Sequence, residues 1–258
     1  MVFLRRFGFR LGILRALAVR ETHLLSAGSL FGWFSVYFQP FLMVAGFILI
    51  RPVIFGRFRI DSLEPVLFIT SFLPFFMFTE LVKKSFRFKK PLGGVFNFST
   101  VSALDMFVTW AVVAWNRYMS LMTALIAACY LLGEKVDLSE WLYAIAGPLG
   151  LLFLGLGCGM TFWGLLLRYP YARMLLASFP RVLFWCSGIL YSAVSLPPFL
   201  QEYMAWNPVF NCIEMLRFGV GLDSSSIFLR PGYAALISLA MLCLGSLLCR
   251  QGGKAYRR

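Results

Sequence analysis

Residues 142–167 read LYAIAGPLGLLFLGLGCGMTFWGLLL, a run that contains no charged side chain. About 20 consecutive apolar residues are enough for a helix to cross the hydrocarbon core of a bilayer, so this stretch predicts a membrane-spanning helix. Gly155 and Gly159 lie about one helical turn apart within it and predict close packing against a neighbouring helix. They lie inside an apolar span rather than between a strand and a helix, which argues against a phosphate-binding loop.

The rest of the chain has the same character. Of its 258 residues, 60% are hydrophobic and only 14% are charged, against about a quarter charged in soluble domains. The sequence therefore predicts an all-α polytopic membrane protein with six spans, at residues 30–50, 65–82, 104–132, 142–167, 178–196 and 232–249. These form a single transmembrane domain over residues 1–258, which leaves no room for a large catalytic domain.

Basic residues set the predicted orientation. Lys and Arg are retained on the cytoplasmic side of a membrane protein, and 17 of the 24 fall on the side that holds both termini, against six on the other. This predicts a cytoplasmic interface segment at 1–29, spans one to five over 30–196, a periplasmic hairpin at 197–231, the sixth span at 232–249 and a cytoplasmic tail at 250–258. The net charge of +13 reflects this orientation and not a nucleic-acid partner, which needs basic residues gathered on one water-facing surface.

The sequence offers little for catalysis or for metal binding. His23 is the only histidine and the six cysteines form no CxxC pair, so neither a histidine-based metal site nor a Ser/His/Asp triad is expected. No GxxxxGKS or GxxxxGKT motif occurs. We therefore predict no catalytic, cofactor-binding or metal-binding residue, and we expect any ATP hydrolysis to belong to a separate subunit.

The segment 197–231 predicts a short broken hairpin, interfacial or re-entrant, that does not cross the membrane. Pro197-Pro198 ends the fifth span, and Trp206-Asn207-Pro208 breaks the chain again before a short apolar run. In this run Glu214 and Arg217 are three residues apart, so they can meet on one face of a helix. We hypothesise that this pair holds the hairpin closed, and that a charge-swapped double mutant recovers part of the function.

Two further features inside the predicted spans allow more than one interpretation. Arg117 is either a functional intramembrane charge or a side chain that snorkels to the cytoplasmic interface. Aromatic residues make up 17% of the chain and mostly suit interfacial belts or packing. Rings on a pore wall can also stack on sugar rings, and the candidates for such a channel lining are Trp33, Tyr37, Trp185 and Tyr191.

Four local patterns occur in order over nearly the whole chain. They are Val19-Arg20-Glu21 with Phe31-Gly32-Trp33 and Gln39-Pro40, Leu73-Pro74-Phe75-Phe76-Met77-Phe78, Gly94-Val95-Phe96-Asn97-Phe98 with Val101 and Asp105, and Trp206-Asn207-Pro208 with Glu214 and Arg217. In this combination the chain resembles the permease subunit of bacterial capsular polysaccharide exporters, which belong to the ABC-2 type of ABC transporter.

The resemblance implies a homodimeric permease in the bacterial inner membrane, whose two copies enclose a channel for a lipid-linked polysaccharide. It also implies a separate ATPase subunit and, often, periplasmic and outer-membrane export partners. By position, the residues that meet the ATPase are Arg20, Glu21, Phe96, Asn97, Phe98 and Asp105. The corresponding periplasmic gate contains Trp206, Asn207, Pro208, Glu214 and Arg217.

The chain departs from the family pattern at two places. Residues 99–103, STVSA, stand where a basic, proline-containing element is usual, and Leu24, Leu25 and Ser26 replace the basic residues that usually follow Arg-Glu. The identity of the glycan and of the ATPase therefore stays open. The first alternative is an ABC-2 permease for O-antigen, teichoic acid or a lipophilic small molecule. A membrane-embedded enzyme of glycan assembly and a purely structural membrane subunit are the others.

Overall fold

The structure, a computed structural model, describes residues 2–26, 28–55, 64–87, 102–191, 197–222 and 229–256, and over these residues it contains helices and connecting turns but no strand. The elements are α1 (Val2–Ser26), α2 (Leu30–Phe55), α3 (Glu64–Arg87), α4 (Ala103–Leu131), α5 (Trp141–Arg168), the 3₁₀ helix η1 (Pro170–Ala172), α6 (Arg173–Cys186), α7 (Pro198–Met204), α8 (Pro208–Gly219) and α9 (Pro231–Tyr256). The all-α prediction is confirmed for this part of the chain.

Five of the helices are long and apolar enough to cross a membrane. Within the described residues these stretches are Phe31–Ile50 of α2, Pro65–Phe86 of α3, Ala103–Leu131 of α4, Trp141–Arg168 of α5 and Pro231–Gln251 of α9. They coincide with five of the six predicted spans, which confirms a multi-pass membrane protein.

The remaining predicted span was 178–196, and the helix found in that region, α6, has different bounds. α6 begins at Arg173 and ends at Cys186, so its 14 residues are too few for a continuous span, which needs about 20. The chain turns at Gly188, whose φ of 65° lies in the left-handed region that residues other than glycine rarely adopt. Residues 192–196 lie outside the described part of the chain.

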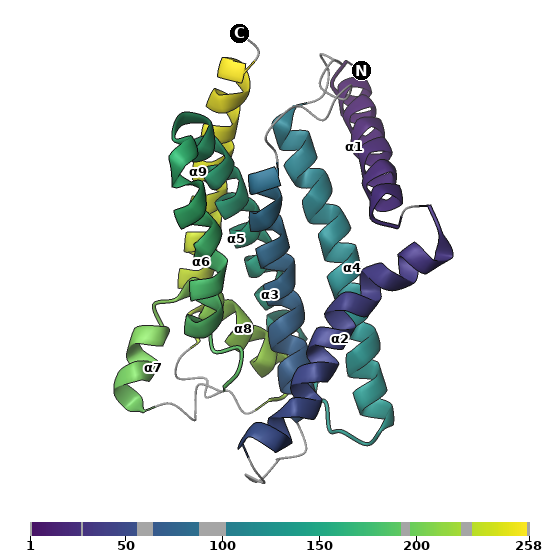
Figure 1. Ribbon diagram of the computed structural model, residues 1–258, viewed down its shortest axis with the longest axis vertical. Helices are drawn as coiled ribbons and strands as arrows, with labels where there is room; N and C mark the ends of the chain where they lie inside the picture. The colour runs from purple at the N-terminus through teal and green to yellow at the C-terminus, as the bar shows by residue number, and fades with distance from the viewer. Residues whose placement is uncertain are drawn as a thin grey trace.

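The helices α2, α3, α4, α5, α6 and α9 run alternately down and up the long axis of the molecule, whereas α1 runs in the same direction as α2 (Figure 1). The first turn of α1 and the last turn of α9 lie at the same end, which is uppermost in Figure 1. α7 and α8 lie toward the opposite end, where α8 packs against α3, α5 and α9. α1 lies beside the upper half of α4 and meets α2 at an elbow.

Glycines of α5 bring its backbone into close contact with its neighbours. A Cβ added to Gly155 would lie 3.1 Å from the Cα of Phe78 in α3. One added to Gly159 would lie 2.9 Å from the carbonyl oxygen of Leu81, which is also in α3. Toward α9, a Cβ on Gly157 would lie 2.6 Å from the carbonyl carbon of Met241. The predicted close packing through Gly155 and Gly159 is confirmed. Small residues favour such contacts in lipid, where packing rather than the hydrophobic effect holds helices together.

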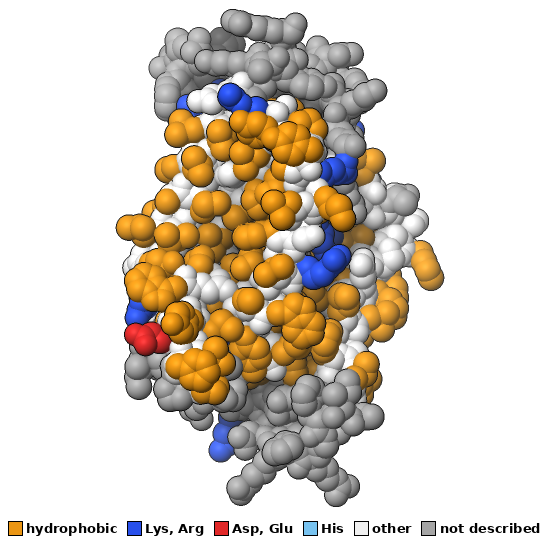
Figure 2. All heavy atoms as spheres, turned by 60° about the vertical axis from the view of Figure 1, so that its left-hand side comes forward, with side chains coloured by type: hydrophobic (Ala, Val, Ile, Leu, Met, Phe, Trp, Pro, Cys, Tyr) orange, Lys and Arg blue, Asp and Glu red, His pale blue; other side chains and the backbone are white. Residues whose placement is uncertain are grey.

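Hydrophobic side chains both fill the interior and cover the outer surface. Phe72 of α3 is fully buried, with its ring centroid 4.6 Å from that of Phe47 in α2 and 5.9 Å from that of Phe184 in α6. Figure 2 shows that hydrophobic side chains also cover most of the face that it presents. An apolar surface of this extent suits contact with lipid or with another membrane chain.

Candidate functional site

Asn207 and Pro208 build the break between α7 and α8. Asn207 is the N-cap residue of α8, and its Oδ1 accepts a hydrogen bond from the Val209 N–H at 3.0 Å. Pro208 suits the first helical position, because it has no N–H to leave unpaired there. The Asn207 side-chain amide also donates to the carbonyl of Cys186 at 2.7 Å, which ties α8 to the end of α6. The break predicted at 206–208 is therefore present.

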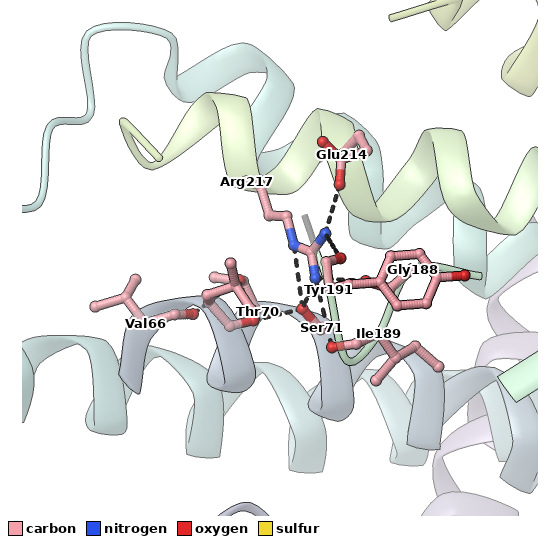
Figure 3. A network of polar contacts seen from close by, with 9 residues as sticks. Val66, Thr70, Ser71, Gly188, Ile189, Tyr191, Glu214 and Arg217 are labelled. Atoms are coloured by element: carbon pink, nitrogen blue, oxygen red, sulfur yellow. Dashed lines mark hydrogen bonds and ion pairs between the residues drawn. The ribbon is translucent and has the colours of Figure 1, made fainter. Parts of the chain in front are cut away.

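α8 carries a buried ion pair. Most of its residues are buried, and the side chains of Glu214 and Arg217 are only 3% and 1% exposed. Nη1 of Arg217 lies 2.5 Å from Oε1 of Glu214 (Figure 3). The contact predicted from their spacing is therefore confirmed, whereas its role as a gate stays a prediction.

Arg217 also donates hydrogen bonds to two other parts of the chain (Figure 3). Its Nε and Nη2 donate to Oγ of Ser71 in α3, at 3.2 and 2.6 Å. Its Nη2 donates to the carbonyl of Gly188 at 2.7 Å, and its Nη1 donates to the carbonyl of Tyr191 at 3.1 Å. We call Arg217, Glu214, Ser71 and the carbonyls of Gly188, Ile189 and Tyr191 the Arg217 network.

The Arg217 network satisfies groups that burial would otherwise leave unpaired. A buried ion pair is costly unless further hydrogen bonds satisfy its remaining donors and acceptors. The carbonyls of Gly188, Ile189 and Tyr191 follow the end of α6, so no next helical turn donates to them. The guanidinium provides these missing donors. It thereby holds α3, α8 and the segment after α6 together at one point.

The turn between α7 and α8 is tied to α9 and to the residue before it. The Tyr233 hydroxyl donates to the carbonyl of Trp206 at 2.7 Å, and the two rings meet edge to face with centroids 5.7 Å apart. The guanidinium of Arg230 lies 5.1 Å from the centroid of the Trp206 indole, a cation–π contact. The Asn211 amide donates to the carbonyl of Ala205 at 2.6 Å, and its Oδ1 accepts from the Arg230 N–H at 3.0 Å. The hairpin is thus held on both sides.

A second polar group, which we call the charged cluster, joins α1, α3 and α4. Lys84 Nζ lies 2.8 Å from Oε1 of Glu21 and 3.4 Å from Oε1 of Glu80. Arg117 forms an ion pair with Oε2 of Glu80, and the same oxygen accepts from the Tyr118 hydroxyl at 2.9 Å. The four charged side chains are between 11% and 19% exposed. Arg117, which the sequence left with two interpretations, is thus paired with a carboxylate of a neighbouring helix.

The residues predicted to meet the ATPase have different surroundings. Glu21 belongs to the charged cluster, and Arg20 beside it is half-buried on α1. Asp105 closes a capping box at the start of α4, where its carboxylate accepts from the N–H and the hydroxyl of Ser102, both at 2.8 Å. Asp105 therefore has a structural contact, and its part in coupling stays a prediction. Outside the described residues lie Phe96, Asn97 and Phe98.

The four candidate channel aromatics fall into two separate places. Trp33 and Tyr37 line a pocket of about 200 Å³ between the end of α1, the start of α2 and α4, which we call the elbow pocket. Trp185 is 64% exposed on α6, and the Tyr191 hydroxyl donates to its carbonyl at 3.0 Å. Within one chain, the structure does not bring the two pairs together.

Sequence reasoning missed the partners that lie on other helices. Ser71 meets Arg217 across 146 residues, and Glu80 meets Arg117 between two spans. Two sequence features could have indicated these partners. Ser71 is a hydroxyl side chain within an apolar run, and Glu80 and Arg117 are charges of opposite sign in two spans. Among the described residues, no three His, Cys, Asp or Glu side chains gather as a metal site requires.

Comparisons with known proteins point to one class of membrane protein. No family model matches the chain. Two curated proteins of Escherichia coli, both described as "Polysialic acid transport protein KpsM", are each 26% identical to it over 248 residues, which cover 95% of this chain and 88% of each relative. This likeness confirms the resemblance to permeases of capsular polysaccharide exporters.

Proposed function

We propose that this chain is the permease subunit of an ATP-driven exporter that carries a lipid-linked capsular polysaccharide across the bacterial inner membrane. The observation that carries the proposal is the likeness to polysialic acid transport proteins over 95% of the chain. The five helices able to cross a membrane agree with it. We infer an acidic glycan of the polysialic acid kind as substrate, and a separate subunit that hydrolyses ATP.

The proposed topology has six spans with both termini in the cytoplasm. The charge count supports this orientation, and the position of both helical ends at one end of the molecule supports an even number of crossings (Figure 1). α6 and the residues after it would make the fifth crossing. Non-helical backbone at membrane depth is tolerated only against protein or a water-filled cavity. The contacts of Arg217 with the carbonyls at 188–191 meet that condition.

Cysteine labelling tests this topology. A single cysteine placed at Ser99 should react only after the membrane is permeabilised, and one placed at Ser225 should react with a membrane-impermeant reagent in intact spheroplasts. The reverse pattern would contradict the proposed orientation.

The proposed coupling route runs from the ATPase through α1 and the segment that contains Phe96, Asn97 and Phe98. The charged cluster supports this route, because its ion pairs connect Glu21 of α1 to α3 and α4. A displacement of α1 would therefore move these helices with it. Two copies of the chain would enclose the channel, with Trp33, Tyr37, Trp185 and Tyr191 as its aromatic lining. Periplasmic and outer-membrane partners would continue the route.

The proposed gate is the hairpin of α7 and α8. The Arg217 network would hold it closed, because it joins α8 to α3 and to the end of α6. Trp206, Asn207 and Pro208 would form its outer corner, where Trp206 is 59% exposed.

Intracellular and surface polysaccharide, measured together, test the export function. Cells without this chain should accumulate the polymer inside and lack it at the surface. A matched strain whose ATPase carries a substituted Walker A lysine should have the same phenotype. Normal surface polysaccharide would refute the proposal. Loss of the polymer both inside and outside would instead favour the membrane-embedded enzyme, although Glu80 and Glu214 are ion-paired and so poorly placed as catalytic acids or bases.

A further inference from the structure

Arg181 is a charged side chain on the surface of α6, close to the middle of the membrane-spanning part of the fold. Phe184, three residues further along α6, has its ring centroid 5.7 Å from that of Phe75. Phe75 lies in the middle of the apolar stretch Pro65–Phe86 of α3. Three residues of α-helix rise about 4.5 Å, so Arg181 lies about one helical turn from mid-depth. Figure 2 shows that Lys and Arg side chains interrupt the hydrophobic surface at about half of its height.

Arg181 has no polar partner among the residues that the structure describes. It is exposed, and it makes no hydrogen bond or ion pair with them. Arg117, by contrast, is paired with Glu80 and is only 11% exposed. A side chain that snorkels lies near a helix end, whereas Arg181 lies more than two turns from the start of α6 at Arg173. A charge at this depth is costly in lipid, and it normally faces a partner or a water-filled cavity.

The face of α6 around Arg181 is not purely apolar. Ser178, three residues before it, and Trp185, four residues after it, lie on the same side of the helix. Ser178 is half-buried, and Trp185 is exposed. The guanidinium and the indole can therefore contact the same ligand.

The neighbouring wall, α2, also carries an exposed polar group near mid-depth. Gln39 lies in the middle of the apolar stretch Phe31–Ile50, and its side chain is exposed. α2 and α6 lie on either side of α3 (Figure 1), and Phe72 of α3 contacts the rings of Phe47 in α2 and Phe184 in α6. Two helices on either side of α3 thus present polar groups where lipid contact would favour apolar ones, as the walls of a water-filled passage do.

An arginine beside an exposed indole suits an acidic sugar. A guanidinium binds a carboxylate through two parallel hydrogen bonds, and an aromatic ring offers an apolar surface to the ring of the sugar. Pores that conduct anions are lined by Arg or Lys side chains.

We propose that Arg181 of each copy faces the translocation channel and binds the carboxylates of an acidic glycan as it passes, while Trp185 stacks on the sugar ring. Arg181 thereby makes the exporter selective for anionic polymers. This inference rests on the proposed export function and adds to it the residue that selects the charge of the substrate.

Transport of two matched probes tests the selectivity. The full chain and its ATPase are reconstituted in proteoliposomes and given a lipid-linked sialic acid oligosaccharide, or the same molecule with its carboxylates converted to methyl amides. The acidic probe should be taken up at least about tenfold faster, because a hydrogen bond to a charged group is lost in the amide. Arg181→Gln should slow uptake of the acidic probe about tenfold and leave that of the amide unchanged. Arg181→Lys, which keeps the charge, should lose less.

The control is Arg250→Gln, which removes the same charge from an exposed position at the end of α9 and should leave uptake unchanged. Equal uptake of the two probes by the wild type, or wild-type uptake of the acidic probe by Arg181→Gln, would overturn the inference and leave the export function standing. Uptake of neither probe would contradict the export function itself, and the inference with it.

Cysteine accessibility tests the position of Arg181 without relying on transport. Arg181→Cys should react with a small, charged, membrane-impermeant thiol reagent in the membrane-embedded complex. Leu239→Cys, at an exposed position near the middle of the apolar stretch of α9, should not react. Peptide mass spectrometry identifies the modified position, since Cys186 and Cys243 are also exposed. An unreactive cysteine at position 181 would place this side chain against lipid or against the second copy, and the proposal would be wrong.

Discussion

Replacing Arg217 with Gln should release α8 from its neighbours. In the folded chain the Arg217 side chain is 1% exposed and is paired with Glu214, which is 3% exposed. The variant leaves the Glu214 carboxylate buried without a positive partner, and it removes the donors to Ser71 and to the carbonyls of Gly188 and Tyr191.

The magnitudes predict a ranking of variants. An unpaired charge in a buried pair costs roughly 3–5 kcal/mol, so Arg217→Gln should favour the opening of α8 by about a hundredfold to a few thousandfold. Glu214→Gln also leaves a buried charge without its counterion, but it keeps an acceptor for Nη1, and the other hydrogen bonds of the guanidinium remain, so its effect should lie at the low end of that range, about 3 kcal/mol. Ser71→Ala removes one neutral acceptor and should cost about 1 kcal/mol. We expect export to decrease in the same order.

The structure also revises one expectation from the sequence. With Glu214→Arg and Arg217→Glu combined, a carboxylate at position 217 would face the carbonyl oxygens of Gly188 and Tyr191, which now accept from the guanidinium. The charge-swapped double mutant should therefore fail to recover function.

Hydrogen exchange of the α8 amides in the purified complex measures the opening directly, and surface polysaccharide at matched protein levels measures export. Glu202→Gln, at an exposed position of α7, is the control within the same hairpin. The reasoning is refuted if α8 exchanges at the wild-type rate in Arg217→Gln, or if Ser71→Ala opens it more than Arg217→Gln does.

Three further outcomes follow from burial and packing. Burial raises the pKa of the Cys212 thiol to about 12, so at pH 8 it is almost entirely protonated, and maleimide should modify it only after denaturation. Because Cys186 and Cys243 are exposed, the measurement is peptide mass spectrometry, and rapid labelling of Cys212 itself in the folded chain would contradict this. Gly157→Ala places a methyl group 2.6 Å from the backbone of Met241 and should destabilise the chain by about 1–3 kcal/mol, which a lower melting temperature would show. The control is Gly46→Ala, which should leave the packing undisturbed because nothing lies within 4 Å of the added Cβ. Glu80→Gln removes the charge that pairs with Arg117 and Lys84 and should lower the melting temperature of the chain more than Glu202→Gln does.

The local features of the hairpin could be predicted from the sequence because they depend on neighbours in the chain. Asn207 and Pro208 carry the chemistry of a helix start, and the spacing of Glu214 and Arg217 places them on one helical face. The long spans could also be predicted from the sequence, because the length of an apolar stretch alone indicates them.

The contacts between distant segments could not be predicted in this way. Ser71 has no sequence feature that selects Arg217 as its partner, and the carbonyl of Gly188 is available only because α6 ends at Cys186. Likewise, the Glu80–Arg117 pair depends on how α3 and α4 are rotated against each other. Such pairings depend on the tertiary arrangement, and the spacing of residues along one helix gives no information about it.

The contacts of Arg217 with the segment after α6 involve main-chain oxygens, which every amino acid supplies. Substitution of Tyr191 therefore leaves its carbonyl in place as an acceptor, so the side chain at this position can change without loss of the hold on α8. Gly188 is the exception, because its φ of 65° and a Phe210 ring atom 2.7 Å from an added Cβ leave no space for another residue. The hold on α8 therefore depends on one arginine and one glycine, and not on the side chain at position 191.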